Sequence, residues 1–335
     1  MLQHTKKIQS IGIVGAGEIV SRLHLPVLNA LPTVKVAWIT DANNARASSV
    51  ANGFGIPTVG LATNPEELPD ADVILLAIPY GVRARYYAAL QSRACALYVE
   101  KPFAKTVAEH EAICAGRPSS HIACGYQRRV MTSVQTVRSL VKEQVFGPLE
   151  RIEFGLGRRG GIRSGTHQSN VKMAGGGMFF ETGVHGLDAL LFVAGAEQAE
   201  LCSGSVAMLD DFEVHVDTAL RVRTAQGVDI PAQVTVTALQ DSIECLRLTF
   251  KRAQLTFSIY NDQPILIRSV SGERLLATLP DHQPRVATLY QTAFVFWRRF
   301  IEGIAGENAN LTSASDSLLT TKIVEQTFAL PRQEL

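Results

Sequence analysis

The stretch Ala96-Leu97-Tyr98-Val99-Glu100-Lys101-Pro102 joins a short apolar run to two opposite charges and a proline. An apolar run of strand-forming residues that ends at a chain breaker predicts a buried strand of a parallel sheet, and ligands of such sheets bind at the carboxyl ends of the strands. Lys101 would stand at that end. The alternative is a strand that surfaces into a solvated charge pair, so the surrounding sequence has to decide.

The N-terminal residues predict a strand, a glycine turn and a helix. Residues 8–14 form a β-branched run, Gly15-Ala16-Gly17 follows, and residues 21–31 have a helical apolar pattern. Gly15 permits a tight turn, and Gly17 lets a pyrophosphate approach the backbone N–H groups at the start of the helix. Val20 stands where a third small residue is usual, so an ordinary tight turn is the alternative.

Asp41 follows the second predicted strand, residues 34–40. A carboxylate at this place hydrogen-bonds the ribose of an adenosine and repels a 2′-phosphate, so it favours NAD over NADP. Arg46 is close enough in sequence to weaken that preference. The alternative role for Asp41 is the N-cap of the helix that follows Ala42.

Strands and helices alternate up to Gly125. Further strands are expected at residues 72–78 and 121–124, and helices at 81–91 and 106–115. This alternation predicts a doubly wound parallel sheet of the Rossmann type, an α/β domain spanning residues 1–125.

From residue 126 to 335 the pattern changes to a second domain. Val214, Val216, Thr218, Leu220 and Val222 alternate with polar residues, and similar alternation recurs up to about residue 267. Period-two patterning without intervening helices predicts a large open antiparallel sheet in an α+β domain. Helices are expected at residues 130–143, 286–304 and 313–330.

The bulk composition excludes several classes of protein. The chain has 335 residues, 46% of them apolar, and a formal net charge of +1, which gives no long-range attraction to nucleic acid or to a membrane surface. Its five cysteines are scattered and form no Cys-x-x-Cys pair, so we expect free thiols, a reducing compartment and no metal site. With no signal peptide and no apolar run of membrane-spanning length, the sequence predicts a cytoplasmic protein.

Glu181 and His185 lie in a second polar segment, Gly175-Gly176-Gly177-Met178-Phe179-Phe180-Glu181-Thr182-Gly183-Val184-His185. Four residues apart on a helix, they share one face, and a carboxylate orients an imidazole for work as a general base or acid. The alternative is a surface Glu–His pair. Glycines are costly within helices and indicate close approach of a ligand or of another backbone.

Together these motifs resemble the Gfo/Idh/MocA oxidoreductases, the glucose–fructose oxidoreductase and inositol dehydrogenase family. The residues that carry the resemblance are the Gly15-Ala16-Gly17 turn, Asp41, Pro79, Glu100-Lys101-Pro102, Gly125-Tyr126-Gln127-Arg128-Arg129 and the triple glycine leading to Glu181 and His185. Three positions depart from the family pattern: Glu181 replaces the usual Asp, Arg83 stands where a histidine is frequent, and Val20 replaces a small residue.

The resemblance implies an NAD(H)-dependent dehydrogenase of sugars or polyols that forms homo-oligomers through its open sheet, with Lys101, Glu181 and His185 as catalytic residues. The residues expected to bind the cofactor are Gly15, Gly17, Glu18, Ile19, Asp41, Pro79, Glu100 and Lys101. Those expected to bind the substrate are Tyr126, Arg163 and His167. A non-catalytic dinucleotide- or sugar-binding regulator and a redox-neutral NAD-dependent glycosidase are the alternatives on this fold.

Three arginines on one loop extend the prediction to the substrate. Arg158, Arg159 and Arg163 follow a predicted strand, and guanidinium groups suit carboxylates and phosphates, so acidic or nucleotide-linked sugars become candidates. Exposed loop arginines are also commonly only solvated.

Overall fold

The computed structural model describes residues 8–57, 64–161, 169–260, 263–272, 274–277, 286, 288–307 and 313–335. The chain forms two compact units. The first unit comprises Met1–Phe103, Glu111–Gly125 and Leu289–Asp316, and the second unit comprises Ala104–His110, Tyr126–Thr288 and Ser317–Leu335. The predicted domain boundary between residues 125 and 126 stays a prediction, because these units are discontinuous in sequence.

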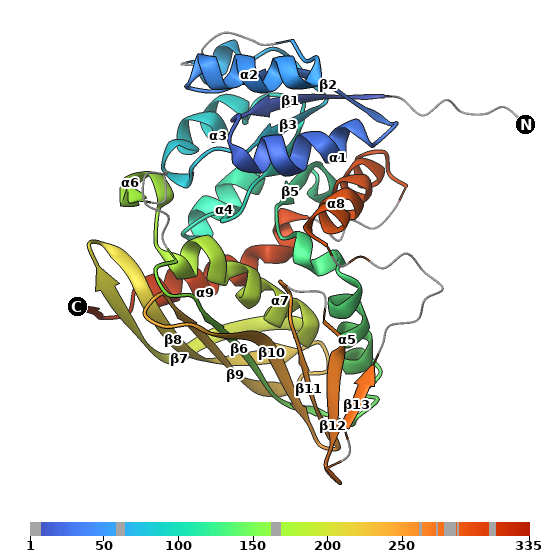
Figure 1. Ribbon diagram of the computed structural model, residues 1–335, viewed down its shortest axis with the longest axis vertical. Coiled ribbons are helices and arrows are strands. Elements are labelled where there is room, and N and C mark those ends of the chain that lie inside the picture. The colour runs from blue at the N-terminus through green and yellow to red at the C-terminus, as the bar shows by residue number, and fades with distance from the viewer. Residues whose placement is uncertain are drawn as a thin grey trace, which may run out of the picture. The chain divides into compact units, whose positions relative to one another are not determined.

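The sheet of the first unit is parallel throughout, as predicted. In the part of the chain that the structure describes, its strand order is β2-β1-β3-β4-β5. The strands are β1 (Gln9–Val14), β2 (Val34–Thr40), β3 (Val73–Leu76), β4 (Ala96–Val99) and β5 (Ile122–Cys124). The helices are α1 (Leu25–Asn29), α2 (Asn44–Phe54), α3 (Ala84–Leu90), α4 (Val107–Cys114), whose first residues belong to the second unit, and α8 (Leu289–Ile304) (Figure 1).

Helix α8 supplies much of the aromatic core of the first unit, although it comes near the end of the chain. Trp297 stacks on Tyr98 of β4 with ring centroids 4.3 Å apart, and Phe296 and Phe300 meet the same ring edge-on. All four side chains are fully buried. Aromatic pairs of this kind contribute about 0.5–1.5 kcal/mol each beyond their buried area.

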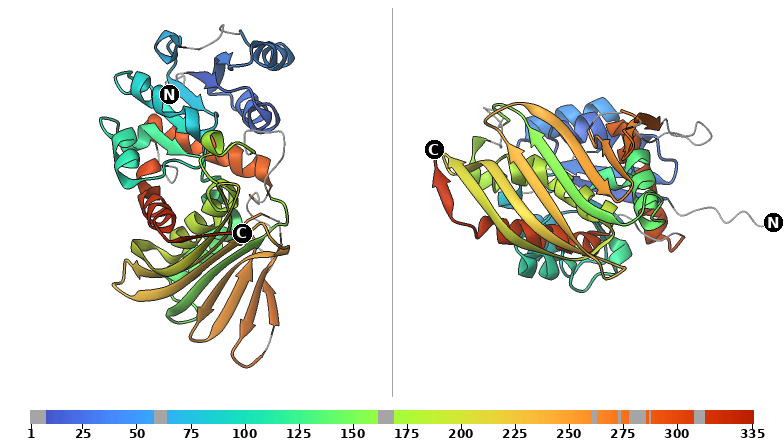
Figure 2. Two further views of the ribbon diagram at one scale, coloured as in Figure 1. Left: turned by 90° about the vertical axis from the view of Figure 1, so that its left-hand side faces the viewer. Right: turned by 90° about the horizontal axis from the view of Figure 1, so that it is seen from below.

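The second unit is built on a broad, largely antiparallel sheet (Figure 2). Among described residues its strand order is β13-β12-β11-β10-β6-β9-β8-β7-β14, and the β6–β9 and β7–β14 pairs are parallel. The strands are β6 (Leu149–Gly157), β7 (Ala196–Leu209), β8 (Phe212–Thr224), β9 (Asp229–Thr237), β10 (Ser242–Phe250), β11 (Ala253–Phe257), β12 (Ile265–Ser269), β13 (Arg274–Ala277) and β14 (Arg332–Glu334). The helices are α5 (Thr132–Lys142), α6 (Val171–Ala174), α7 (Val184–Ala194) and α9 (Leu318–Phe328).

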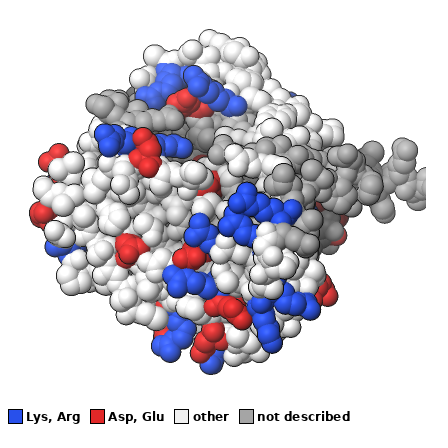
Figure 3. All heavy atoms as spheres, turned by 60° about the horizontal axis from the view of Figure 1, so that its bottom comes forward, with Lys and Arg blue, Asp and Glu red and all other residues white. Residues whose placement is uncertain are grey.

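The two faces of this sheet differ in the way that the alternating pattern predicts. On β8 the even-numbered residues from Phe212 to Thr224 are buried, and α7 and α9 pack against the sheet on that side. The other face carries polar pairs, including Arg221 with Glu200 and Arg223 with Asp229 at 2.9 Å. Figure 3 shows positive and negative side chains lying next to one another over this region.

Two glycines, one before α7 and one within it, are required by packing against β8 and β6. A Cβ added at Gly177 would collide with the backbone of Glu213 in β8, and one at Gly186 would overlap the Phe154 ring of β6. The Phe180 N–H donates to Oε1 of Glu213 at 2.9 Å. The close approach indicated by the sequence is therefore made by other parts of the fold, the backbone of Glu213 at Gly177 and the Phe154 ring at Gly186.

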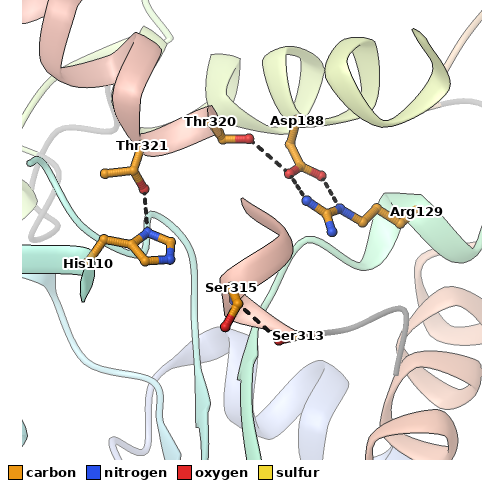
Figure 4. Close-up of polar contacts among 7 residues, drawn as sticks. All are labelled: His110, Arg129, Asp188, Ser313, Ser315, Thr320 and Thr321. Carbon is orange, nitrogen blue, oxygen red and sulfur yellow. Dashed lines mark hydrogen bonds and ion pairs between the residues drawn. The ribbon is translucent and has the colours of Figure 1, made fainter. Parts of the chain in front are cut away.

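A buried ion pair fixes α7 to the segment that follows Gly125 (Figure 4). Arg129 Nε and Nη2 donate to the two carboxylate oxygens of Asp188 at 2.8 and 2.6 Å, and the Thr320 hydroxyl of α9 donates to Asp188 at 3.1 Å. Both charged side chains are at least 95% buried. Such a fully hydrogen-bonded pair is costly to break, because removing one partner leaves a buried charge.

One helical run, Val171–Ala194, is long and apolar enough to cross a membrane by length and composition alone. In the structure 83% of its most apolar window is buried inside the fold, as in the core helix of a globular protein.

Candidate active site

The glycine turn of the first unit is tight on one side and open on the other. Gly15 has φ +105°, and a Cβ there would collide with the carbonyl of Ala77, so this position requires glycine. Nothing lies within 4 Å of a Cβ built on Gly17. Val20 is accommodated with its side chain fully buried in a π-helical turn, Val20–His24.

Glu18 and Ile19 follow the open side of the turn. Glu18 forms an exposed ion pair with Arg22 at 2.8 Å, and Ile19 is partly exposed. Exposed backbone with no side chain over Gly17 leaves the room that a dinucleotide pyrophosphate requires. These residues therefore fit the predicted cofactor, and their assignment as ligands remains a prediction.

Asp41 connects the glycine turn to α2. Its Oδ2 accepts a hydrogen bond from Ala16 N at 2.8 Å, and its Oδ1 accepts one from Asn43 N at 2.8 Å. The N-cap of α2 is Asn43, which accepts from Arg46 N, so the N-cap alternative for Asp41 is wrong. Each Asp41 oxygen keeps a second lone pair for a ligand hydroxyl. Arg46 Nη1 lies 4.0 Å from Oδ2.

Glu100, the residue directly after β4, accepts a hydrogen bond from His24, whose tautomer is fixed. The indole N–H of Trp297 donates to His24 Nδ1 at 2.9 Å, so the ring proton of His24 lies on Nε2, which donates to Glu100 Oε1 at 3.0 Å. Burial alone would raise the pKa of Glu100, but this hydrogen bond and the charges of Lys101 and Arg83 lower that pKa below the ordinary value of a glutamate. Glu100 is therefore a buried carboxylate.

Arg83 fixes the backbone around Lys101. Its guanidinium is buried and donates to the carbonyls of Glu100 at 2.6 Å and Lys101 at 3.4 Å, and to that of Pro102. Its Nε donates to Ile78 O at 2.9 Å, which ties the same group to the loop that carries Pro79. One planar fork thus joins the ends of β3 and β4.

The turn that Arg83 holds contains a cis Lys101–Pro102 peptide bond, and the Lys101 side chain is partly exposed. The charge of Lys101 is one of those that lower the pKa of the neighbouring Glu100. Lys101 is thus a cation at the carboxyl end of a central strand, where the sequence predicted it.

His185 lies in the first turn of α7 in the second unit. It is only 7% exposed, and the rings of Tyr126 and Tyr260 stand perpendicular to its imidazole at centroid distances of 6.1 and 6.3 Å. The Tyr260 hydroxyl donates to Thr182 O at 2.9 Å, which fixes that ring. Two tyrosines therefore define the surroundings of the imidazole.

Glu181 precedes His185 in a π-helical turn, Phe179–Gly183, that runs directly into α7. Its side chain is partly exposed, and its N–H donates to Gly177 O at 2.9 Å. Single π-turns inside helices are frequent at functional sites. The sequence predicted a plain α-helix here, because periodicity does not distinguish one wide turn from an α-turn.

Arg128 shares a neighbour with His185, the Tyr260 ring, and the sequence alone gave it no separate role. Its Cζ lies 4.9 Å from the centroid of the Tyr260 ring, and its side chain is buried. Glu244 is close enough to act on its charge, although both Glu244 oxygens already accept hydrogen bonds, from the Ser258 hydroxyl and from Ile259 N. The only sequence feature that pointed to Arg128 was its place in the adjacent pair Arg128-Arg129.

The predicted substrate-binding residues have different outcomes. Tyr126 is buried against His185, whereas Arg163 and His167 lie outside the described residues. Arg158 and Arg159, on the same loop as Arg163, are exposed.

Comparison with known proteins identifies the family. Residues 9–123 match the family model of the "Oxidoreductase family, NAD-binding Rossmann fold", and residues 134–260 match that of the "GFO/IDH/MocA C-terminal domain". The chain belongs to the Gfo/Idh/MocA oxidoreductase family. The predicted family is thus confirmed, and so is the Rossmann sheet followed by a largely antiparallel one.

Two curated members of the Gfo/Idh/MocA family illustrate the similarity. The chain is 26% identical to the rhizopine catabolism protein MocA of Rhizobium meliloti, over 56% of this chain and 57% of that protein. It is 23% identical to the D-glucoside 3-dehydrogenase of Escherichia coli, over 55% of this chain and 54% of that protein. The matched segment thus spans about half the length of these relatives.

A solved structure covers the whole fold. A 3-ketoreductase from Actinomadura kijaniata, in complex with NADP and TDP-benzene, superimposes with a TM-score of 0.81 at 18% identity and 98% coverage of both chains. At this identity the likeness establishes the fold alone.

The contacts of Arg83 predict a loss of turnover when its fork is removed. Arg83→Lys keeps the charge but cannot reach the separate carbonyls at once, so the backbone at Lys101 should shift. We expect the turnover of NAD(P)-dependent oxidation to fall by about 10- to 100-fold, since small displacements of a reacting group have effects of this size.

In this experiment the KM for the cofactor should change little, and Arg85→Lys, an exposed neighbour, is the control. Steady-state kinetics of both variants measure the effect. Wild-type turnover in Arg83→Lys would show that the guanidinium contacts do not position Lys101.

Proposed function

We propose that this protein is an NAD(P)-dependent oxidoreductase that interconverts a hydroxyl-bearing carbon of a sugar, polyol or sugar derivative and the corresponding carbonyl. The proposal rests on two features of this family member. The Glu100–Lys101 turn at the end of a Rossmann strand is held by Arg83, and the buried His185 contacts two tyrosine rings. The names of related proteins, a glucoside 3-dehydrogenase and a 3-ketoreductase, support the substrate class.

In this proposal His185 takes the proton of the reacting hydroxyl, and the C–H bond of the same carbon breaks with its electron pair. Lys101 donates a hydrogen bond to the oxygen and stabilises the negative charge that develops there. Glu181 orients the imidazole and stabilises its protonated form. Glu181 is one methylene longer than the family's usual Asp, and it lies in the π-helical turn Phe179–Gly183.

The cofactor would be held by the first unit. Gly15, Gly17, Glu18 and Ile19 would receive its pyrophosphate, Asp41 its ribose, and Pro79, Glu100 and Lys101 would line its nicotinamide half. When bound, the nicotinamide accepts or returns the hydride, and every proton in the reaction is handled by the side chains named above.

The assigned roles predict a specific loss of chemistry. His185→Gln and Lys101→Met should each reduce turnover by about 10²–10⁴-fold, the usual contribution of a positioned base or electrostatic stabiliser. Binding of NAD(H), followed by the quenching of protein fluorescence, should remain within a few fold of wild type. Because the two residues act on one oxygen, the double variant should be little worse than either single variant. Near-wild-type turnover in either variant would remove its assignment.

The cofactor preference follows from Asp41. Its carboxylate, only 12% exposed and bound to the turn, should repel a 2′-phosphate, so NAD is preferred to NADP. In Asp41→Asn the ratio of kcat/KM for NAD to that for NADP should fall by about tenfold or more, since 1.4 kcal/mol of repulsion corresponds to a factor of ten.

Asp70→Asn removes an exposed carboxylate from the same unit and should leave the ratio unchanged. Kinetics with both cofactors measure it. A wild-type ratio in Asp41→Asn would assign the preference to other residues, Arg46 among them.

We also propose that the protein is a homo-oligomer joined through the polar face of the nine-stranded sheet. The β8 residues in the centre of this face are only partly exposed, and Asp217 accepts hydrogen bonds from Gln233 and Thr235 at 2.6 and 2.7 Å, so this carboxylate is hydrogen-bonded within the sheet. Light scattering should give a multiple of the 36.3 kDa chain mass, and Ala219→Glu on this face should shift it towards one chain. A wild-type mass of one chain would contradict the proposal.

The cytoplasm remains the proposed location. All five cysteines lie within the described part of the chain and are free thiols, which supports a reducing compartment.

A further inference from the structure

Arg128 is a buried cation, and at least one of its hydrogen-bond donors has no acceptor among the described residues. Its side chain is 8% exposed, and its Nε is buried without an acceptor among the described residues. No described carboxylate forms an ion pair with it. A guanidinium carries five N–H donors and stays charged, so burial without partners is costly.

The neighbouring Arg129 shows what a structural arginine looks like in the same segment. Its guanidinium forms two parallel hydrogen bonds to Asp188 and is fully neutralised within the fold. The two residues share the same short 3₁₀ turn, Gln127–Val130. Arg129 thus has a carboxylate acceptor within the fold, whereas the Nε of Arg128 has none among the described residues.

Tyr260 and Glu244 partly offset the cost of burying the Arg128 charge, but neither accepts a hydrogen bond from its Nε. The Tyr260 ring face supports the guanidinium at 4.9 Å, as in cation–π pairs. Glu244 acts on it through its charge, while the oxygens of Glu244 are hydrogen-bonded to Ser258 and Ile259. Burial is the largest influence on Arg128 and lowers its pKa, which reflects this incomplete neutralisation.

Tyr260 also links Arg128 to the proposed base. The same ring that carries the guanidinium on its face stands perpendicular to the His185 imidazole at 6.3 Å. The Tyr260 ring is therefore a neighbour of both His185 and Arg128. Gln127, buried next to Arg128, has a side-chain oxygen that also lacks a hydrogen-bond partner in the described chain.

We propose that Arg128 binds an anionic oxygen group of the substrate, a carboxylate or a phosphoryl group, while the sugar hydroxyl faces His185. This inference rests on the proposed function and makes the substrate an acidic or phosphorylated sugar. It assigns anion recognition to a buried residue rather than to the exposed loop residues Arg158 and Arg159.

The test uses the whole 335-residue chain with saturating NAD and matched sugars. D-glucose is compared with D-glucuronate for the carboxylate, with glucose 1-phosphate for a phosphate monoester, and with UDP-glucose for a nucleotide diphosphate. Wild type should prefer at least one anionic member over D-glucose in kcat/KM. Arg128→Met should lose about 100-fold or more on that substrate and only a few fold on D-glucose, because truncating one partner of a buried charge pair has effects of this size.

Two further arms separate recognition from structure. Melting temperatures without substrate should rise in Arg128→Met, since the variant removes an incompletely neutralised buried charge, whereas a structural arginine would give a fall. The preferred anionic sugar should raise the melting temperature of wild type but not that of Arg128→Met. Arg158→Met and Arg159→Met are the controls and should retain the anion preference.

Equal kcat/KM for anionic and neutral sugars in wild type would overturn the inference and leave the proposed function standing. Loss of the preference in Arg158→Met with its retention in Arg128→Met would also overturn it, in favour of the loop. If no sugar is oxidised at all, the proposed function fails, and anion-dependent stabilisation of wild type alone would still uphold the Arg128 site.

Discussion

The buried carboxylate of Glu100 is the interaction on which the rest of the first unit depends. A negative charge inside a protein persists only if hydrogen bonds and cations surround it. Here His24 donates the hydrogen bond, Trp297 fixes the tautomer that allows it, and Arg83 and Lys101 supply the charge. The same contacts that make this carboxylate tolerable also fix the backbone that presents the lysine. Stability and the position of the functional cation are therefore not separable in this turn.

Much of the fold could be predicted from periodicity, and the exceptions have identifiable causes. Buried parallel strands such as β3 and β4 are continuous apolar runs, and β8 alternates strictly, so both were found. Strand β7 was missed because its sequence, Ala196–Leu209, is rich in small and polar residues and lies mostly exposed. It is a strand because its neighbour β8 pairs with it over nearly its whole length, a long-range cause that local propensity does not contain.

In the candidate site, too, the reactive residues could be predicted and the residues that position them could not. Lys101, Glu181 and His185 could be proposed from the sequence because each stands in a motif of the family that the chain resembles. The residues that hold the Glu100–Lys101 turn could not be predicted. His24 and Trp297 are 273 positions apart in the sequence, and the Arg83 guanidinium donates its hydrogen bonds to backbone carbonyls, which leave no trace in the sequence. Arg128 and Arg129 are identical and adjacent in sequence, yet one is neutralised by Asp188 and the other is not. Only packing distinguishes them.

The position of α8 in the chain has a consequence for biosynthesis. The aromatic core of the first unit needs Phe296, Trp297 and Phe300, which leave the ribosome after strands β6 to β13 of the second unit have been made. The N-terminal segment must therefore wait, incompletely packed, while some 160 later residues emerge. A chain halted before this helix lacks the aromatic side chains that cover Tyr98, and apolar surface exposed in this way favours aggregation until translation is nearly finished.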